Sequence, residues 1–220
     1  MWNKVKVKRP VTTTCWKVDS TRPDPEIISG AGLILCRGGL VAFPTETVYG
    51  LGANAMNADA VRKIFAAKGR PVDNPLIVHL ATSQQVETVA RLIMPYARDL
   101  MKAFWPGPLT LVLPGKGVLP REVTAGLDTL AVRVPDHQVA RDLIQAAGVP
   151  VAAPSANTSG RPSPTTAEHV LADLDGLIDG LLDAGPAGLG VESTVLDATG
   201  EIPLILRPGG VTPEQIKSVA

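Results

Sequence analysis

Hydrophobic residues along the chain form two kinds of pattern. Short uninterrupted apolar runs, typical of buried strands, occupy residues 39–44, 75–80, 109–113, 130–134 and 149–153, with further strand-like segments near 177–183, 191–196 and 202–206. Elsewhere apolar residues recur every three or four positions, as in Val61, Ile64 and Phe65, which predicts amphipathic helices. The order of the two patterns is mixed. We therefore predict an α/β protein of the α+β type whose sheet is not purely parallel.

Capping residues set the expected helix boundaries. Asn57 is a suitable N-cap and Gly69 a suitable C′ residue for one helix. Further helices are expected from Ser83 to about Met94, from Pro95 to Phe104, from Asp136 to Gly148 and near 166–174, and a capping box, Thr212-Pro-Glu-Gln215, begins the last one. The segment Phe43-Pro-Thr-Glu-Thr-Val-Tyr-Gly-Leu-Gly52 lies between a strand and a helix and is predicted to be a turn.

Composition narrows the class of protein. The 220 residues suffice for one large domain or two small ones. Lys and Arg together number 21, as do Asp and Glu, so the basic excess usual for a general nucleic-acid-binding surface is missing, although a local basic cavity stays open. Cys15 and Cys36 are too few for a disulfide framework and wrongly spaced for zinc, which favours reduced thiols in a cytoplasmic protein. No apolar run is long enough to span a bilayer, so we expect no membrane partner.

Two short polar clusters carry the candidate chemistry. Lys68-Gly-Arg70 follows a predicted helix, and Ser155-Ala-Asn157 follows a predicted strand. Neighbouring prolines stiffen both loops, and rigid cations and hydroxyl donors suit phosphate or carboxylate ligands. Ser155 lies in no G-x-S-x-G elbow, so a binding hydroxyl is favoured over a nucleophile. Together the clusters indicate a nucleotide or carboxylate site.

Other residues have a plain structural interpretation beside a functional one. Residues 50–55 match the dinucleotide fingerprint G-x-G-x-x-A, but a segment separates them from the strand, which disfavours a Rossmann site. Thr45 and Thr47 are suited to bonding the backbone of their own turn. His79, in an apolar strand, is more often a core histidine than a ligand. Arg133, inside another apolar strand, needs a partner, a cavity or the open face of the sheet.

Several motifs taken together resemble one family. They are Phe43-Pro-Thr-Glu-Thr-Val-Tyr-Gly-Leu-Gly52, Lys68-x-Arg70 with Asn74-Pro75, Trp105-Pro-Gly-Pro-Leu-Thr110, Ala131-Val-Arg133, Ser155-x-Asn157 and Leu206-Arg-Pro-Gly209. In this order and spacing the chain, from about residue 20 onward, resembles the YrdC-type L-threonylcarbamoyladenylate synthase family. Six motifs in register are far more specific than any one of them.

The resemblance implies a fold and a reaction. The expected fold is a twisted, open, mixed parallel and antiparallel sheet flanked by helices, with a concave cationic cavity. The expected reaction converts L-threonine, bicarbonate and ATP into threonylcarbamoyl-AMP and pyrophosphate, and a separate complex then transfers the threonylcarbamoyl group to the adenosine next to the anticodon of tRNA. Mg²⁺ is expected to be held mainly by the ATP phosphates, with no metal site built by the protein.

The same resemblance assigns roles to residues of this sequence. It implies threonine contacts from Thr47, His79, Arg133, the Ala153 backbone and Ser193, with Thr45 as second choice. It implies ATP contacts from Lys68, Arg70, Asn74, Thr129, Ser155, Ser163 and Arg207, with Asn157 supporting the Ser155 loop, and Lys68 and Arg70 as the catalytic pair. Three anionic reactants must meet, so fixed cations matter more here than a nucleophile or a base.

The expected organisation is an N-terminal arm or edge strand over residues 1–19, including the alternating basic residues 4–9, and a YrdC-like synthase domain over 20–220. The sequence is most similar to the longer branch of the family, in which a linker and a second domain follow. It stops at Ala220, where that linker would begin, and a natural short form and a truncated sequence both stay open.

Two other functions are weighed. A non-catalytic double-stranded RNA or tRNA-binding module would bind RNA in a salt-dependent manner and ignore threonine. The carbamoyl-transfer domain of hydrogenase maturation usually lies among zinc-finger modules, and this chain has no metal-spaced cysteines. Weak tRNA binding beside the synthase reaction is left open.

Overall fold

The computed structural model describes residues 12–220, and its central element is a ten-stranded mixed sheet. The strands are β1 (Thr14–Lys17), β2 (Val41–Phe43), β3 (Gly50–Asn54), β4 (Ile77–His79), β5 (Leu109–Pro114), β6 (Thr129–Arg133), β7 (Val151–Ala152), β8 (Gly180–Asp183), β9 (Thr194–Asp197) and β10 (Leu204–Arg207). They lie in the order β1-β8-β2-β3-β7-β4-β6-β5-β9-β10. Parallel pairs such as β4 with β6 adjoin antiparallel pairs such as β5 with β6, which confirms the predicted mixed sheet. The basic segment 4–9 lies outside the described residues.

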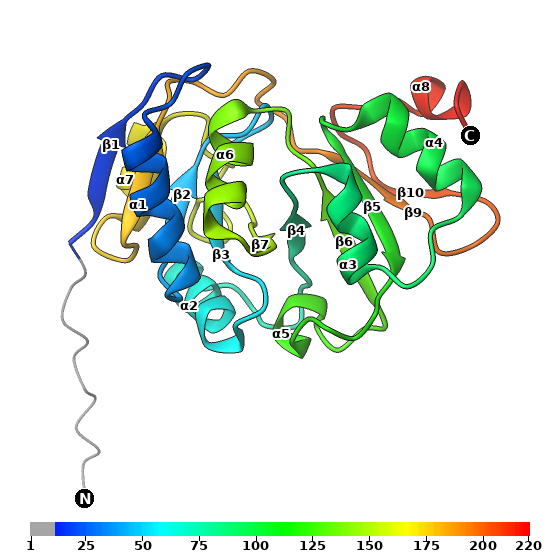
Figure 1. Cartoon of the computed structure of the whole chain (residues 1–220), viewed down its shortest axis with the longest axis horizontal. Coiled ribbons are helices and arrows are strands. Elements are labelled where there is room, and N and C mark those ends of the chain that lie inside the picture. Colours follow the sequence, from blue (N-terminus) through cyan, green and yellow to red (C-terminus); the bar gives the residue numbers. More distant parts are fainter. Residues whose placement is uncertain (1–11) are drawn as a thin grey trace, which may run out of the picture.

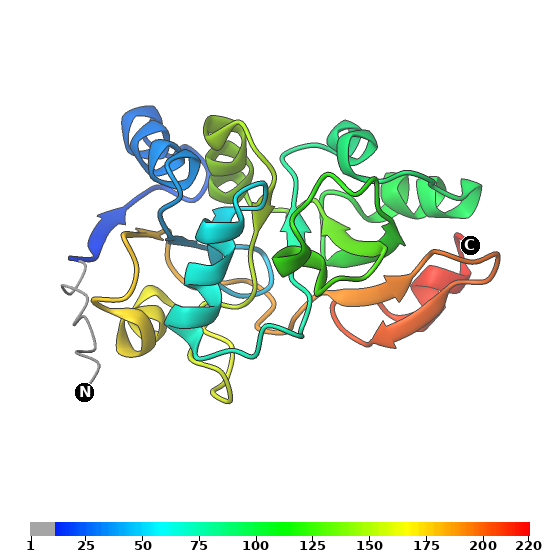
Figure 2. The same cartoon turned by 90° about the horizontal axis from the view of Figure 1, so that it is seen from below.

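Helices cover both faces of the sheet. They are α1 (Pro25–Cys36), α2 (Ala58–Lys68), α3 (Val86–Val89), α4 (Pro95–Phe104), α5 (Arg121–Thr124), α6 (Gln138–Ala147), α7 (Ala167–Leu174) and α8 (Pro213–Lys217), and a 3₁₀ turn spans Ser83–Gln85. Helices α1 and α6 run side by side over one face of the β1 to β7 region (Figure 1). Viewed from below, α2 and α7 lie on the opposite face of that region (Figure 2).

Helix boundaries that depend on local capping chemistry are confirmed. Asn57 Oδ1 accepts hydrogen bonds from the N–H groups of Asp59 and Ala60, and Gly69 ends α2 with a φ of 59°. The segment predicted from Pro95 to Phe104 is α4, with the same bounds. The capping box at Thr212 begins α8 as expected. These signals are local in sequence, so the chain needs no tertiary context to express them.

Helix α1 is absent from the sequence-based prediction. Its start signal is present: Asp24 caps the helix through a bond from Glu26 N, and Pro25 occupies the first turn. The helix also contains Gly30 and Gly32, and because glycine is unfavourable inside a helix, the pattern does not indicate one. Gly32 has a tertiary reason, since a Cβ there would lie 2.8 Å from the carbonyl carbon of Ala146 in α6. The close approach of α1 and α6 therefore requires this glycine.

The turn predicted over residues 43–52 is wrong at its end. Residues Gly50–Asn54 form β3, which pairs with β2 and β7 in the middle of the sheet. A Cβ at Gly52 would lie 2.8 Å from the ring of Phe43 and 3.0 Å from Val151. Here glycine makes room for the neighbouring strands, which is a requirement that β propensity does not reveal.

Three smaller predictions are wrong. The helix predicted from Ser83 to Met94 is a 3₁₀ turn followed by the single-turn α3, because Ala90 instead forms a bridge with Gly115. Helix α6 is preceded by His137 as N-cap and not by Asp136, whose carboxylate pairs with Arg141 at 3.0 Å. The short α5 over Arg121–Thr124 has no counterpart in the prediction.

Candidate functional site

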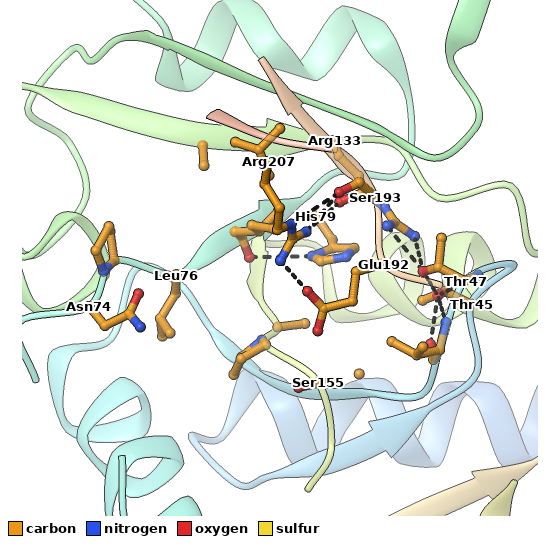
Figure 3. A pocket seen from close by; sticks show the side chains of 18 of the residues that line it. Thr45, Thr47, Asn74, Leu76, His79, Arg133, Ser155, Glu192, Ser193 and Arg207 are labelled. Atoms are coloured by element: carbon orange, nitrogen blue, oxygen red, sulfur yellow. Dashed lines mark hydrogen bonds and ion pairs between the residues drawn. The ribbon is translucent and has the colours of Figure 1, made fainter. Parts of the chain in front are cut away.

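A cavity of about 360 Å³ opens where the central strands meet the loops that follow β2 and β7 (Figure 3). This volume lies in the range of ligand sites, roughly 300–1,000 Å³. The sequence-predicted residues in its wall are Thr45, Thr47, Arg70, Asn74, His79, Arg133, Ala153, Ser155, Ser193 and Arg207. These residues come from seven segments of the chain, so the fold brings together what the sequence separates.

Strand register places His79 beside Arg133. Strands β4 and β6 are parallel neighbours, with Ile77 opposite Ala131 and His79 opposite Arg133. Since successive side chains of a strand point to opposite faces, these four residues share the face that forms the cavity. Val78 and Val132 point to the other face and are fully buried in the core.

Arg133 is a buried cation with a fixed partner. Its Nη2 donates to Glu46 Oε2 at 2.8 Å, and both terminal nitrogens donate to Thr47 Oγ1 at 3.2 Å. The side chains of Arg133 and Glu46 are 4% and 14% exposed. Burial lowers the pKa of the guanidinium, and the Glu46 charge opposes that shift. The Nε of Arg133 is buried and makes no hydrogen bond within residues 12–220, so a donor is left for a ligand carboxylate.

Thr45 holds the turn that presents Thr47. Its Oγ1 donates to the Val48 carbonyl at 2.6 Å and lies 2.8 Å from Thr47 Oγ1. The backbone N–H groups of Thr47 and Val48 also bond to it, each at 3.2 Å. The predicted bonding of a threonine to the backbone of its own turn therefore applies to Thr45, whereas the Thr47 hydroxyl accepts hydrogen bonds from Arg133.

His79 is a neutral hydrogen-bonding group. Burial, with the charge of Arg133, lowers the pKa of its imidazole to about 3. Its Nδ1 lies 3.3 Å from the Ile77 carbonyl, which can only accept, so Nδ1 carries the proton. Nε2 is then an acceptor, suited to a hydroxyl or an amine.

A second ion pair lies on another wall of the cavity. The Arg207 guanidinium pairs with Glu192 Oε2, and Ser163 Oγ donates to Glu192 Oε1 at 2.8 Å. Arg207 Nη2 also donates to the carbonyl of Ser193 at 2.8 Å. This pair is much more open than the first, with side chains 39% and 37% exposed for Arg207 and Glu192. Ser163 does not line the cavity itself, but reaches it through Glu192.

The Ser155 loop is anchored from behind by Lys68. The Lys68 ammonium donates to the carbonyls of Ser155 and Asn157 and to Asn157 Oδ1, and Ser155 Oγ donates to the same Oδ1 at 2.6 Å. Burial, with the charge of Arg70, lowers the pKa of Lys68 to about 8. Lys68 and Asn157 lie outside the lining of the cavity, whereas Ser155 and Arg70 are part of it. In this structure Lys68 therefore orders the loop and does not face the cavity.

Thr129 is the predicted site residue that the fold separates from the others. It begins β6 and lines a second hollow of about 210 Å³, together with Arg91, Lys116 and Asp128. The two carboxylates Glu46 and Glu192 were not proposed as site residues from the sequence. Their one signal is position, because Glu46 lies inside the 43–52 motif and Glu192 directly precedes Ser193.

Close backbone packing holds the second wall. A Cβ on Gly209 would lie 2.3 Å from the Glu192 carbonyl oxygen and 2.4 Å from the backbone of Ser193 and Thr194. The chain after β10 therefore rests directly against the segment that carries Glu192. Glycine is required at this position by contact, since its φ lies outside the left-handed region.

The part of the chain that the structure describes has neither a membrane-spanning helix nor a metal-binding cluster. Across residues 12–220, no helix is both long and apolar enough to cross a membrane. In that part of the chain, no three His, Cys, Asp or Glu side chains gather in a way suited to a metal ion. Both cysteines are free thiols.

Comparison with known proteins gives consistent relatives. The Sua5/yciO/yrdC family model, described as "Telomere recombination", matches residues 33–209. A Bacillus subtilis protein named threonylcarbamoyl-AMP synthase is 58% identical over 212 residues, which are 94% of this chain and 61% of that protein. The crystal structure of Pyrococcus abyssi Sua5 complexed with L-threonine superposes with a TM-score of 0.92 at 53% identity, and the match covers 94% of this chain and 61% of that one.

The fold extends to more distant structures. E. coli YciO superposes with a TM-score of 0.84 at 24% identity, over 93% of this chain and all of that one. The chain spans less than two thirds of the B. subtilis and P. abyssi proteins. The matched segment nevertheless includes all the cavity-lining residues. On this evidence the chain belongs to the Sua5/YciO/YrdC family.

Proposed function

We propose that this chain is a threonylcarbamoyl-AMP synthase, which joins L-threonine, bicarbonate and ATP and releases pyrophosphate. The observation that carries the proposal is one cavity with two chemically different walls. A buried guanidinium beside a neutral histidine forms one part of the lining, and Arg70, Ser155 and Arg207 belong to the part that adjoins it. The synthase name of the B. subtilis relative and the threonine in P. abyssi Sua5 support the same function.

Threonine is assigned to the wall built around Arg133. A guanidinium with an unused Nε suits the carboxylate of an amino acid. The acceptor Nε2 of His79 and the Thr47 hydroxyl suit the threonine hydroxyl or amine, with the Ala153 backbone and Ser193 completing the wall. Fixing the amine in this way orients it for attack on bicarbonate.

ATP is assigned to the adjoining wall, which meets the threonine wall where Arg207 donates to Ser193. Arg70, Asn74, Ser155 and Arg207 line it and supply the donors that phosphate oxygens require. Lys68 and Asn157 support the Ser155 loop from behind, and Ser163, which donates to Glu192, is assigned to ATP by the resemblance. Thr129 would meet ATP only if the nucleotide extended toward the second hollow, so its role rests on the resemblance alone.

The proposed reaction needs no protein nucleophile. The threonine nitrogen bonds to the bicarbonate carbon, and a C–O bond breaks as water leaves, which gives a carbamate. A carbamate oxygen then bonds to the α-phosphorus while the bond to the β-phosphate oxygen breaks, so pyrophosphate departs. The chain contributes position and positive charge, which are the main terms in such phosphoryl chemistry.

Mg²⁺ is proposed to enter as its complex with ATP, where it would neutralise phosphate charge. Glu192 is the carboxylate in the lining of the cavity, and Arg207 and Ser163 already occupy both of its oxygens. The ligands for the ion would therefore come mainly from the triphosphate.

The product is proposed to pass to a separate complex that transfers the threonylcarbamoyl group to tRNA, with at most weak direct tRNA binding by this chain. The two free thiols favour placing this activity in the cytoplasm.

Pyrophosphate release tests the proposal. The protein is incubated with ATP and Mg²⁺, and threonine and bicarbonate are each omitted in turn. Release that needs both substrates is expected, and Arg70→Ala should slow it because a phosphate contact is lost. Arg98→Ala, which removes an exposed guanidinium paired with Glu87, is the matched control.

Absence of release, together with salt-dependent tRNA binding that ignores threonine, would instead support the RNA-binding module. Absence of release with threonine and ATP still bound would refute a synthase activity of this chain by itself.

A further inference from the structure

Glu192 is the carboxylate that faces the cavity, and it lies among cations. It precedes β9 and lies between Arg207 and Ser155 in Figure 3. One oxygen pairs with the Arg207 guanidinium, and the other accepts the bond from Ser163 at 2.8 Å. Arg207 and Ser163 are both residues that the proposed function assigns to ATP. Glu192 therefore occupies groups that a phosphate would use.

The influence of Glu192 extends beyond this pair. Its negative charge raises the pKa of Lys68, Arg70 and Arg133, against the lowering effect of burial. Four cationic side chains from three segments of the chain thus lie near this one anion, and Arg133 has Glu46 as a further partner. Without it, they would repel one another across a cavity that holds no other lining carboxylate in the described part of the chain.

The Glu192–Arg207 pair is placed to open. Both side chains are more than a third exposed, so water can solvate each charge when the two separate. Exposed ion pairs contribute little net stability, because solvation offsets most of the attraction. The buried Arg133–Glu46 pair lacks that solvation and is expected to stay closed.

We propose that Glu192 is a specificity-determining residue that acts as an exchangeable counter-ion, occupying the polyphosphate position until a polyanion displaces it. The inference rests on the proposed function, since it takes Arg207 and Ser163 as phosphate contacts. A triphosphate that reaches several cations at once offsets the lost pair. A single small anion only replaces one negative charge by another, so Glu192 selects against orthophosphate.

The variant Glu192→Gln tests the proposal, because the amide keeps the size and can still accept from Ser163 but carries no charge. Binding of inorganic triphosphate, ATP and orthophosphate is measured by calorimetry without Mg²⁺. We expect the affinity for triphosphate and ATP to rise about threefold to fivefold, as the loss of one weak competing ion pair allows. Orthophosphate binding should become measurable. The affinity for L-threonine should change much less, because Arg133 keeps its closer partner Glu46.

A matched variant removes the same charge elsewhere. Glu201→Gln alters an exposed carboxylate in the turn between β9 and β10 and should leave all three affinities unchanged. Weaker or unchanged triphosphate binding in Glu192→Gln would overturn the proposal, because it would make the carboxylate a ligand contact or a bystander. An equal gain in Glu201→Gln would also overturn it, since net charge alone would then explain the effect.

The outcome is separable from that of the proposed function. If Glu192→Gln binds triphosphate more tightly but the unsubstituted protein releases no pyrophosphate in response to threonine, the counter-ion role of Glu192 is supported and the synthase function is refuted. If pyrophosphate is released but Glu192→Gln binds triphosphate no more tightly, the synthase function is supported and the counter-ion role is refuted.

Discussion

The two ion pairs of the cavity use the same chemistry in opposite settings. Arg133 and Glu46 are almost fully buried, whereas Arg207 and Glu192 are each more than a third exposed. Burial fixes the first pair, since separating its charges would leave one without solvent. Exposure makes the second exchangeable. One half of the site is thus organised before any ligand arrives, and the other half can be reorganised by the ligand.

The largest expected difference between the two pairs is in stability. Glu46→Gln should lower the free energy of unfolding by about 3–5 kcal/mol, because it leaves a buried guanidinium without its counter-ion. Glu192→Gln should change the same quantity by no more than about 1 kcal/mol. Denaturant unfolding of both variants measures the contrast. Equal effects would mean that the two pairs do not differ in the way their burial indicates.

Threonine affinity is the next test. Arg133→Ala should weaken threonine binding by roughly 1.5–3 kcal/mol, because one charge-assisted carboxylate contact is lost, and should spare ATP binding. The variant is best made together with Glu46→Gln, so that no buried carboxylate remains unpaired. Calorimetry with threonine and with ATP separates the two effects. An unchanged threonine affinity would remove Arg133 from the site.

Lys68→Met should act on the nucleotide wall alone. The substitution leaves the carbonyls of Ser155 and Asn157 without the Lys68 donor, which costs about 1–3 kcal/mol of stability and weakens ATP binding by loosening Ser155. Threonine binding should persist. Lys63→Met is the control, since Lys63 is an exposed residue of the same helix and donates to the Gly38 carbonyl, outside the cavity lining. A threonine defect as large as the ATP defect would contradict the separation of the walls.

The smallest effect concerns pH. The pKa of His79 is about 3 in the folded protein, below its ordinary value of 6.5. Between these values the unfolded chain binds a proton that the folded chain does not, so His79 reduces stability as pH falls through this window and has no such effect above it.

Threonine affinity should accordingly show no inflection from His79 between about pH 5.5 and 8, as measured by calorimetry across that range. An inflection near the ordinary histidine value that vanished in His79→Gln would show that the imidazole is protonated in the folded state.

Sequence reasoning succeeded where the signal was local. The caps of α2 and the capping box of α8 are each written in a few adjacent residues, and they are found where predicted. It failed where a residue is required by contact with a distant neighbour. Gly32 is required by its contact with α6, and Gly52 by its contact with Phe43. A glycine in the sequence does not indicate which neighbouring element packs against it, so α1 and β3 were not predicted.

The site follows the same rule. Its cations and hydroxyls were predicted because the resemblance covers their motifs, whereas the partners were not. Glu46 lies 87 positions from Arg133, and Glu192 lies 15 positions from Arg207. Pairings of this kind appear only once strand order and register are known, because no local pattern marks a carboxylate as a counter-ion.

Gly209 shows that an absent methyl group can be part of a binding site. Its backbone lies so close to Glu192, Ser193 and Thr194 that any side chain would push this segment toward the ligand space. Substitution there would change the shape of the cavity by displacing the backbone of Glu192 and Ser193, both of which line it. The shape of the cavity therefore depends on backbone packing at Gly209 as well as on the charged groups that line it.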